Sequence, residues 1–223
     1  MIATLPEVIT EDELAQIRRI VSSVEFVDGK ATAGGFLQNA KNNQQIPWDH
    51  PAMKNIAGMV MRALERCDGF MSAAQPRKLA AMLVSRYLPG MSYGFHVDAP
   101  LMMKPNHIRS DVSFTLFLNE PGDYVGGELA FAHGGVETSV KLPARSVVCY
   151  PTGQLHCVRP IESGERLVVV GWVQSLVRDA GVRELLYDLS EVRDRLAGQE
   201  GTHRALELVV KSYSNLLRRH AEP

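Results

Sequence analysis

The chain has 223 residues, 45% of them apolar, and its formal charge of −1 comes from 24 basic and 25 acidic side chains. This length and composition predict one globular domain with a substantial core and some appended helices. The sequence shows no basic run that would indicate nucleic-acid binding, and no stretch of about 18 uncharged apolar residues that would predict a membrane span.

Targeting signals and cysteine usage both favour the cytoplasm. The N-terminus lacks a basic region followed by an apolar run, so we expect no signal peptide. The three cysteines, Cys67, Cys149 and Cys157, form an odd and sparse set that argues against a disulfide framework. We therefore expect a cytoplasmic protein in which each cysteine is a small core residue.

Two helices are predicted in the N-terminal support region, residues 1–77. Thr10 to Glu13 has the form of a capping box and precedes apolar residues at helical spacing, which predicts a helix at about residues 11–23. Pro51 begins a second amphipathic stretch, which predicts a helix at about 51–66. The segment between them is rich in glycine and amide side chains, so we expect a loop with at most a short strand.

The pattern changes at Lys78, and residues 78–178 are predicted to form a β domain. Short segments rich in β-branched and aromatic residues alternate with turn signals such as Pro89-Gly90 and Gly126-Gly127. Many short strands at this spacing predict an antiparallel sandwich or barrel. No helical pattern interrupts them, which excludes a series of βαβ units. The expected fold class is mainly β with flanking helices.

Residues 179–223 return to helical spacing. One apolar stripe runs from Leu185 to Leu196, and a second follows Gly201 from Leu206 to Leu217. This pattern predicts a C-terminal helical hairpin that packs on the β domain or on a second subunit. Packing on a second subunit would make the protein a homo-oligomer through these helices.

His96, Asp98 and His156 are the candidate metal ligands and catalytic residues. Residues two apart on a strand point to one face, so His96 and Asp98 can reach one ion from a single strand. The fold has to supply His156. Two imidazoles and one carboxylate on one side of an ion leave the opposite positions open, as non-haem Fe(II) requires when it binds a co-substrate and O₂.

Arg166 is the candidate anchor for the co-substrate. Its guanidinium offers a bidentate fork to a carboxylate, so we predict that metal-bound 2-oxoglutarate, a dicarboxylate, extends to Arg166. Ser163-Gly164 predicts a hairpin between the strands of His156 and Arg166. A two-residue loop would place these side chains on opposite faces, so we expect an odd loop or a bulge that places them on one face.

Three other interpretations of these residues stay open. A cupin-like protein would keep the β fold and the metal without 2-oxoglutarate, although Arg166 argues against it. A zinc hydrolase would use the same ligands, but the sequence lacks a general-base motif such as His-Glu-x-x-His. A non-catalytic module would use the C-terminal hairpin as its binding surface.

Residues 86–98 resemble the prolyl 4-hydroxylase signature of Fe(II)/2-oxoglutarate dioxygenases. The signature is a Tyr, a Pro-Gly turn, a second Tyr three residues before a His, and then His-x-Asp, here Tyr87, Pro89, Gly90, Tyr93, His96 and Asp98. The Gly-Gly-Glu-Leu segment at 126–129, with His156 and Arg166, extends the resemblance to the bacterial PKHD-type hydroxylases. The similarity is strong over residues 78–178.

The resemblance implies a double-stranded β-helix (jelly-roll) core and a defined reaction. These enzymes couple decarboxylation of 2-oxoglutarate to succinate and CO₂ with hydroxylation of a second substrate, and L-ascorbate is a common helper. By resemblance, His96, Asp98 and His156 match the iron ligands, Arg166 the 2-oxoglutarate anchor, and Tyr87 a second 2-oxoglutarate contact. The presence of Asp98 implies hydroxylation rather than halogenation.

The substrate is left open between a small molecule and a peptidyl side chain. The association of the family with bacterial iron uptake implies a siderophore- or receptor-linked substrate. A loop after Asp98 contains Met102, Met103, Lys104 and His107. We expect this loop at the mouth of the β domain, where substrate enters. Met102, Met103 and Lys104 either contact substrate or belong to a flexible lid without specific contacts, and His107 is expected to be a surface or loop residue.

Overall fold

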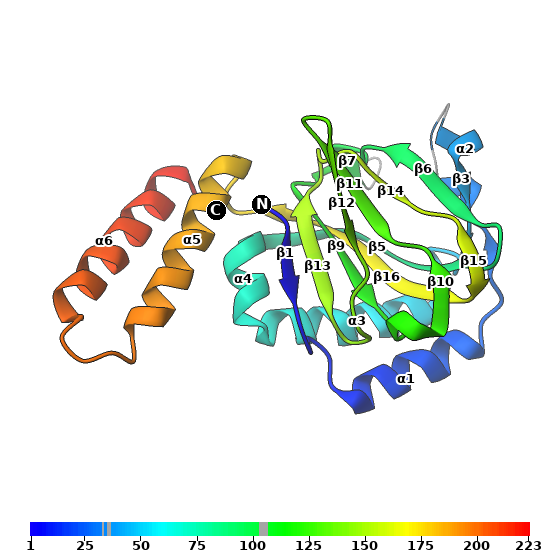
Figure 1. Ribbon diagram of the computed structural model, residues 1–223, viewed down its shortest axis with the longest axis horizontal. Helices are drawn as coiled ribbons and strands as arrows, with labels where there is room; N and C mark the ends of the chain where they lie inside the picture. The colour runs from blue at the N-terminus through cyan, green and yellow to red at the C-terminus, as the bar shows by residue number, and fades with distance from the viewer. Residues whose placement is uncertain (33, 35–36, 103–106) are drawn as a thin grey trace.

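The computed structural model describes residues 1–32, 34, 37–102 and 107–223, and two antiparallel sheets form its centre (Figure 1). The larger sheet contains, in spatial order, β1 (Ala3–Leu5), β13 (Val147–Pro151), β9 (Val112–Phe117), β16 (Arg166–Ser175), β5 (Pro76–Tyr87), β4 (Gln44–Gln45) and β2 (Val27–Asp28). The smaller sheet contains β12 (Val136–Val140), β11 (Leu129–His133), β14 (His156–Val158), β6 (Ser92–His96) and β3 (Lys41–Asn42).

Two further strand pairs lie beside these sheets. One joins β10 (Tyr124–Gly126) to β15 (Ile161–Gly164), and the other joins β7 (Leu101–Met102) to β8 (Ile108–Arg109). Among the described residues no ladder joins the larger sheet to the smaller one, so the β domain is a sandwich rather than a closed barrel. The mainly β fold with a jelly-roll core and flanking helices is confirmed.

Alternation along the central strands creates two apolar layers. Val168 of β16 and Val148 of β13 belong to the cluster between the sheets, while their neighbours Val169 and Val147 belong to the cluster beneath the helices. Successive strand residues face opposite sides. Both faces of the larger sheet are therefore buried, which explains why its strands read as nearly continuous apolar runs.

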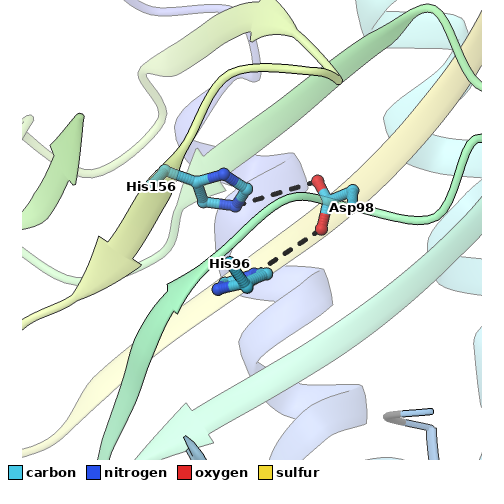
Figure 2. A group of neighbouring side chains, drawn as sticks. All are labelled: His96, Asp98 and His156. Carbon is cyan, nitrogen blue, oxygen red and sulfur yellow. Dashed lines mark ion pairs between the residues drawn. The ribbon is translucent and has the colours of Figure 1, made fainter. Parts of the chain in front are cut away.

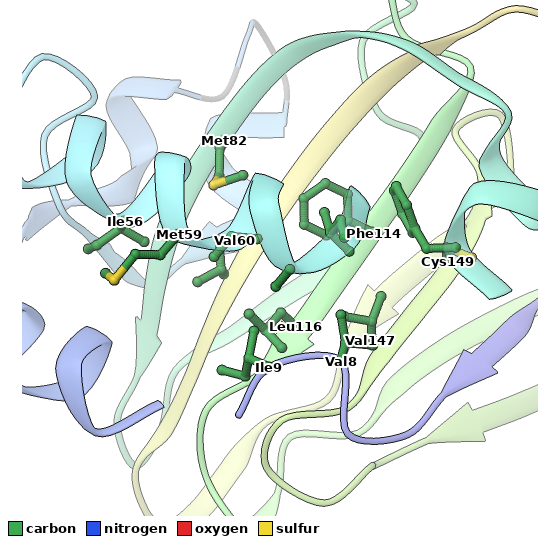
Figure 3. Close-up of a cluster of buried hydrophobic side chains, with 14 of the residues drawn as sticks. Val8, Ile9, Ile56, Met59, Val60, Met82, Phe114, Leu116, Val147 and Cys149 are labelled. Carbon is green, nitrogen blue, oxygen red and sulfur yellow. The ribbon is translucent and has the colours of Figure 1, made fainter. Parts of the chain in front are cut away.

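The predicted N-terminal helices are present and cover the outer face of the larger sheet. Helix α1 (Glu11–Ser22) follows a capping box on Thr10. The N-cap of α3 (Pro51–Arg66) is His50, whose ring nitrogen accepts a hydrogen bond from the Ala52 backbone N–H. Figure 3 shows α3 side chains packed against side chains of the sheet. A short helix not predicted from the sequence, α4 (Asp68–Ala74), extends this layer.

The segment between α1 and α3 is more structured than the expected loop. It contains β2, a 3-10 turn at Gly29–Thr32, a one-turn helix α2 (Leu37–Ala40), β3 and β4. Elements of two to four residues are too short to show a periodicity in sequence. They matter for the site because they extend both sheets at the edge nearest β5 and β6.

The predicted hairpin between the strands of His156 and Arg166 is wrong. His156 begins β14 in the smaller sheet, whereas Arg166 begins β16 in the larger sheet. The intervening β15 pairs with β10 instead. The chain crosses between the sheets here, so neither an odd loop nor a bulge aligns the two side chains. Both side chains line the same cavity, each from a different sheet.

The predicted C-terminal hairpin is present and projects to one side of the sandwich (Figure 1). It consists of α5 (Ala180–Leu196) and α6 (His203–His220). Helix α5 buries Arg183 and Leu186, whereas α6 has no buried residue. Within the described ranges no helix has the length and apolar character needed to cross a membrane.

Candidate active site

Three candidate ligands meet between the sheets, where their side chains point toward one another (Figure 2). His96 ends β6 and pairs directly with His156, the first residue of β14. Asp98 lies two residues beyond the end of β6, so it reaches the histidines from a loop. His96 Nε2 is 3.6 Å from Asp98 Oδ1, and His156 Nε2 is 3.8 Å from Oδ2.

Backbone carbonyls orient both imidazoles. Nδ1 of His96 is 2.8 Å from the Gly94 carbonyl oxygen, and Nδ1 of His156 is 2.8 Å from the Gln154 oxygen. In the tautomer that these contacts favour, Nδ1 donates a proton and Nε2 keeps its lone pair. Both Nε2 atoms then face Asp98 as potential ligands.

Two residues that the sequence analysis missed hold the carboxylate. Asp98 Oδ2 accepts hydrogen bonds from Ser113 Oγ and Trp172 Nε1, each at 2.8 Å. Ser113 lies on β9 and Trp172 on β16, so both come from the larger sheet. These two hydrogen bonds hold the Asp98 carboxylate in place. No local sequence motif predicts that Ser113 or Trp172 contacts Asp98.

The protonation states suit a metal centre. Burial lowers the pKa of His156, because the charged imidazolium loses its hydration, while Asp98 acts in the opposite direction. Burial acts to raise the pKa of Asp98, but the neighbouring histidines and the Trp172 N–H outweigh it and hold that pKa below its usual value. An ionised carboxylate and a neutral imidazole are the forms that bind a metal.

The donor set fits a divalent cation. One ligand atom from each of His96, Asp98 and His156 lies within 4.8 Å of the others, and both histidines are buried. Two imidazoles and one carboxylate on one side are typical of an open Fe(II) site. These residues come from the smaller sheet and the loop after it, whereas their support comes from the larger sheet.

Arg166 lines the same cavity as the three candidate ligands and is 1% exposed. Its guanidinium lies 5.2 Å from the ring centroid of Tyr87, its partner in the β16–β5 ladder, and 5.5 Å from that of Phe117. Its Nε has no hydrogen-bond partner, and no ion pair involves it, within the described ranges. A buried cation in this state requires an anion.

Two tyrosines lie near this arginine. Burial raises the pKa of Tyr87, and the Arg166 charge partly opposes that effect. Tyr124, which the sequence analysis missed, has a buried hydroxyl that approaches the Arg166 side chain but makes no hydrogen bond of normal geometry in the described part of the chain. A Cβ built on Gly127 would touch the side chains of both Tyr124 and Arg166, so these two lie side by side. The hydroxyls add neutral donors near the cation.

A cavity of about 810 Å³ connects these groups to the surface. Its inner wall includes Leu129, Tyr150 and Val170, and it continues along β5 toward α3. Trp48, which is 70% exposed, and Met102 lie at its outer part. Of the residues named in the loop after Asp98, Met102 lines the cavity, His107 does not, and Met103 and Lys104 lie outside the described residues.

Comparisons with known proteins show the family of the chain. Residues 82–174 match the 2OG-Fe(II) oxygenase superfamily, named for 2-oxoglutarate. The chain is 48% identical to a PKHD-type hydroxylase of Gloeothece citriformis over 222 residues, and 45% identical to one of Picosynechococcus, with complete coverage of both chains in each case.

Solved structures share the fold at low identity. A prolyl-4-hydroxylase from Pseudomonas putida matches with a TM-score of 0.54 and 22% identity, over 78% of this chain and 92% of the other. A prolyl hydroxylase from Trichoplax adhaerens matches with a TM-score of 0.55 and 16% identity, over 85% and 86%. The full-length identity to its relatives shows that the chain belongs to the PKHD-type hydroxylases of the 2OG-Fe(II) oxygenase superfamily, and is therefore a dioxygenase.

Proposed function

We propose that His96, Asp98 and His156 hold Fe(II), and that Arg166 binds the far carboxylate of 2-oxoglutarate. The observation that carries this proposal is a buried arginine without an ion-pair partner, among the described residues, in the same cavity as the three ligands. In this assignment Tyr87, which lines the cavity beside Arg166, donates its hydroxyl to the same carboxylate. Arg166 sets the orientation of the co-substrate through a bidentate, charge-assisted contact.

The residues of the chain prepare the site, and the metal supplies the oxidative chemistry. Bound iron would supply O₂ activation, coupled to decarboxylation of 2-oxoglutarate to succinate and CO₂. The backbone contacts to His96 and His156 keep each Nε2 available. Ser113 and Trp172 hold Asp98 in place, and the apolar inner wall excludes water from the reacting groups.

The hydroxylated substrate is proposed to enter through the outer part of the cavity, past Trp48 and Met102. A small molecule and a peptidyl side chain both fit this description. A link to iron uptake, and L-ascorbate as an accessory reductant, are parts of the proposal that rest on the resemblance alone. Screening candidate metabolites and peptides for a mass gain of about 16 Da, one oxygen atom, identifies the substrate.

Location and assembly complete the proposal. All three cysteines are free, and Cys149 and Cys157 are buried, which supports a cytoplasmic protein. Apolar side chains stay exposed on the C-terminal hairpin, including Leu185, Val192 and Leu208. We propose that this stripe contacts a second copy of the chain. Light scattering that gives a monomer mass at all concentrations would exclude this assembly.

The test of the reaction separates it from a cupin-like metal protein without 2-oxoglutarate turnover. Protein loaded with Fe(II) under anaerobic conditions is titrated with 2-oxoglutarate, and O₂ is then admitted. We expect a metal-to-ligand charge-transfer band in the first step and succinate in the second. An iron-loaded, folded protein that gives neither signal is not the proposed enzyme.

A further inference from the structure

Lys41 is a buried cation on the wall of the active-site cavity. Strand β3 pairs with β6, and the register places Lys41 beside Tyr93. Lys41 is 5% exposed, and its Nζ lies 5.3 Å from the Tyr93 ring centroid. Tyr93 stacks on His96 with ring centroids 3.6 Å apart. One aromatic ring therefore separates the ammonium from a candidate metal ligand.

The ammonium of Lys41 has no carboxylate partner in the described ranges. Nζ donates one hydrogen bond, to Thr32 Oγ1 at 2.7 Å, and no Asp or Glu oxygen of the described chain forms an ion pair with it. Thr32 Oγ1 in turn donates a hydrogen bond to Gln45 Oε1 at 2.8 Å. The hydroxyl and the amide that Lys41 approaches are both uncharged, so neither neutralises the ammonium. An ammonium has three donors. Two of them are available to a ligand.

The electrostatic state of Lys41 agrees with this geometry. Burial lowers its pKa to about 8, although the more distant charges of Asp98 and Asp28 act in the opposite direction. The side chain therefore stays mainly protonated at neutral pH. A buried charge of this kind is costly unless an opposite charge approaches it.

A second orphaned group lies on the same wall. Asn43 is two residues beyond Lys41, and its side-chain amide approaches the Tyr87 hydroxyl, but neither Nδ2 nor Oδ1 makes a hydrogen bond of normal geometry among the described residues. Lys41, Asn43 and Gln45 alternate along the chain, and all three line the cavity. Buried amides are almost always hydrogen-bonded. An unsatisfied amide and an unpaired cation in the lining of one cavity together favour a polar ligand that binds there.

We propose that Lys41 binds an anionic oxygen group of the substrate, a carboxylate in its simplest form, and makes the enzyme selective for organic acids. This inference rests on the proposed function, because it assigns 2-oxoglutarate to Arg166 and leaves Lys41 to the substrate. The two cations lie on different sheets, Arg166 on β16 and Lys41 on β3. Lysine acts as a point charge, which suits an oxyanion of varied geometry.

A matched pair of probes tests this role. The protein is loaded with redox-inert Zn(II) and saturating 2-oxoglutarate, which fills the Arg166 site. The dissociation constants of 3-phenylpropanoate and of its uncharged amide are then measured by calorimetry. We expect wild type to bind the acid about tenfold more tightly than the amide, because a charge-assisted contact in a desolvated cavity is strong. Lys41→Met is expected to abolish the preference.

Two further variants separate charge from structure. Lys41→Arg is expected to retain a preference for the acid, because it keeps the charge. Lys54→Met removes an exposed cation of α3 that also lines the cavity, and it is expected to leave the preference within about twofold. A purely structural Lys41 would change protein stability in Lys41→Met without changing the ratio of the two dissociation constants.

The failure of this inference is distinguishable from that of the proposed function. Wild type and Lys41→Met are both expected to form the anaerobic charge-transfer band with Fe(II) and 2-oxoglutarate. If wild type lacks the band, the proposed function is overturned. If the band forms but wild type binds the acid no better than the amide, or binds neither, the role of Lys41 alone is overturned.

Discussion

At the scale of single residues, the polar groups of the cavity fall into two kinds. Asp98, His96 and His156 are held by hydrogen bonds from the protein before any ligand arrives. Arg166 and Lys41 are buried cations without ion pairs among the described residues. The first kind is preorganised for a cation and the second for anions. The cavity is therefore built for ligands of both signs.

Trp172→Phe tests the support of the metal ligand. The change removes the 2.8 Å hydrogen bond from Nε1 to Asp98 Oδ2 while it keeps a large aromatic side chain. We expect the affinity for Fe(II) to fall about 10-fold or more, because partners of metal ligands orient them. Titration with Co(II), monitored by its visible absorption, measures the effect.

The other tryptophan supplies the control for this change. Trp48→Phe alters a side chain that is 70% exposed at the outer part of the cavity. It is expected to leave Co(II) affinity unchanged. Equal metal affinity in wild type and Trp172→Phe would contradict a positioning role for Trp172.

Arg166→Met tests the anchor of the co-substrate. The change keeps an apolar stem between Tyr87 and Phe117 but removes the guanidinium. Loss of a bidentate contact to a carboxylate is expected to weaken 2-oxoglutarate binding by about 100-fold, with the metal retained. The anaerobic charge-transfer titration reports the binding directly.

Tyr87→Phe provides a smaller change for comparison with Arg166→Met, because it removes one neutral hydroxyl and keeps the ring. We expect it to weaken 2-oxoglutarate binding by about 10-fold at most. If Arg166→Met loses the metal rather than 2-oxoglutarate, the assignment of Arg166 is wrong.

At the scale of elements, sequence reasoning succeeds where the signal is local. His96-Val97-Asp98 and the capping box at Thr10 are read from neighbouring residues. The structure contains the capping box where expected and brings His96 and Asp98 together, but Asp98 lies in the loop after β6 rather than on the same strand as His96. The hairpin at Ser163-Gly164 fails because β15 pairs with β10, which lies far earlier in the chain. Spacing alone does not specify which sheet a strand joins.

The missed residues share one property. Ser113, Trp172 and Lys41 each come from an element distant in sequence from the residue that they support or approach. Strand β3, which carries Lys41, is only two residues long. A strand of that length has no periodicity, so only the tertiary structure reveals that Lys41 lies beside the site.

The glycine that follows the bulged end of β10 gives an element-scale prediction. Gly127 has a φ of +69°, and a Cβ there would lie 2.3 Å from Ile161 Cδ1 and 3.1 Å from Arg166 Cδ. Gly127→Ala is therefore expected to destabilise the protein by about 2–3 kcal/mol and to displace Arg166. Denaturant unfolding measures the first effect, and 2-oxoglutarate titration the second.

The control for Gly127→Ala is a glycine that also has a positive φ but has no neighbouring atoms where a Cβ would lie. Gly134 has a φ of +55°, and a Cβ there would meet nothing within 4 Å. Gly134→Ala is expected to cost about 1 kcal/mol and to leave 2-oxoglutarate binding intact. Normal 2-oxoglutarate affinity in Gly127→Ala would show that this glycine does not position Arg166.

At the scale of the whole molecule, the buried charges of the ligand cavity lower the free energy of unfolding. The core beneath the helices is fully apolar at its centre (Figure 3), where Ile56, Val60 and Phe114 are inaccessible to solvent. The space between the sheets instead contains buried charges. Groups that serve ligands are commonly kept at a cost in stability. That cost is measurable in the metal-free protein.

Lys41→Met is expected to stabilise the metal-free protein at pH 7. The pKa of Lys41 is about 8 in the folded protein, below its ordinary value of 10.5. Below about pH 8 the ammonium is charged in both states, so its burial cost is fully present. As pH rises from about 8 to 10.5, only the folded state has lost its proton, and the cost disappears. We expect a gain of about 1–3 kcal/mol at pH 7.

The comparison of wild type with Lys41→Met by urea unfolding, at a series of pH values, tests this expectation. The stability difference should be largest at neutral pH and shrink as pH approaches 10.5, because wild type gains stability over that window. Lys41→Arg, which keeps a charge throughout, should show no comparable change with pH. A variant Lys41→Met less stable than wild type at pH 7 would mean that the hydrogen bond to Thr32 outweighs the cost of the buried charge.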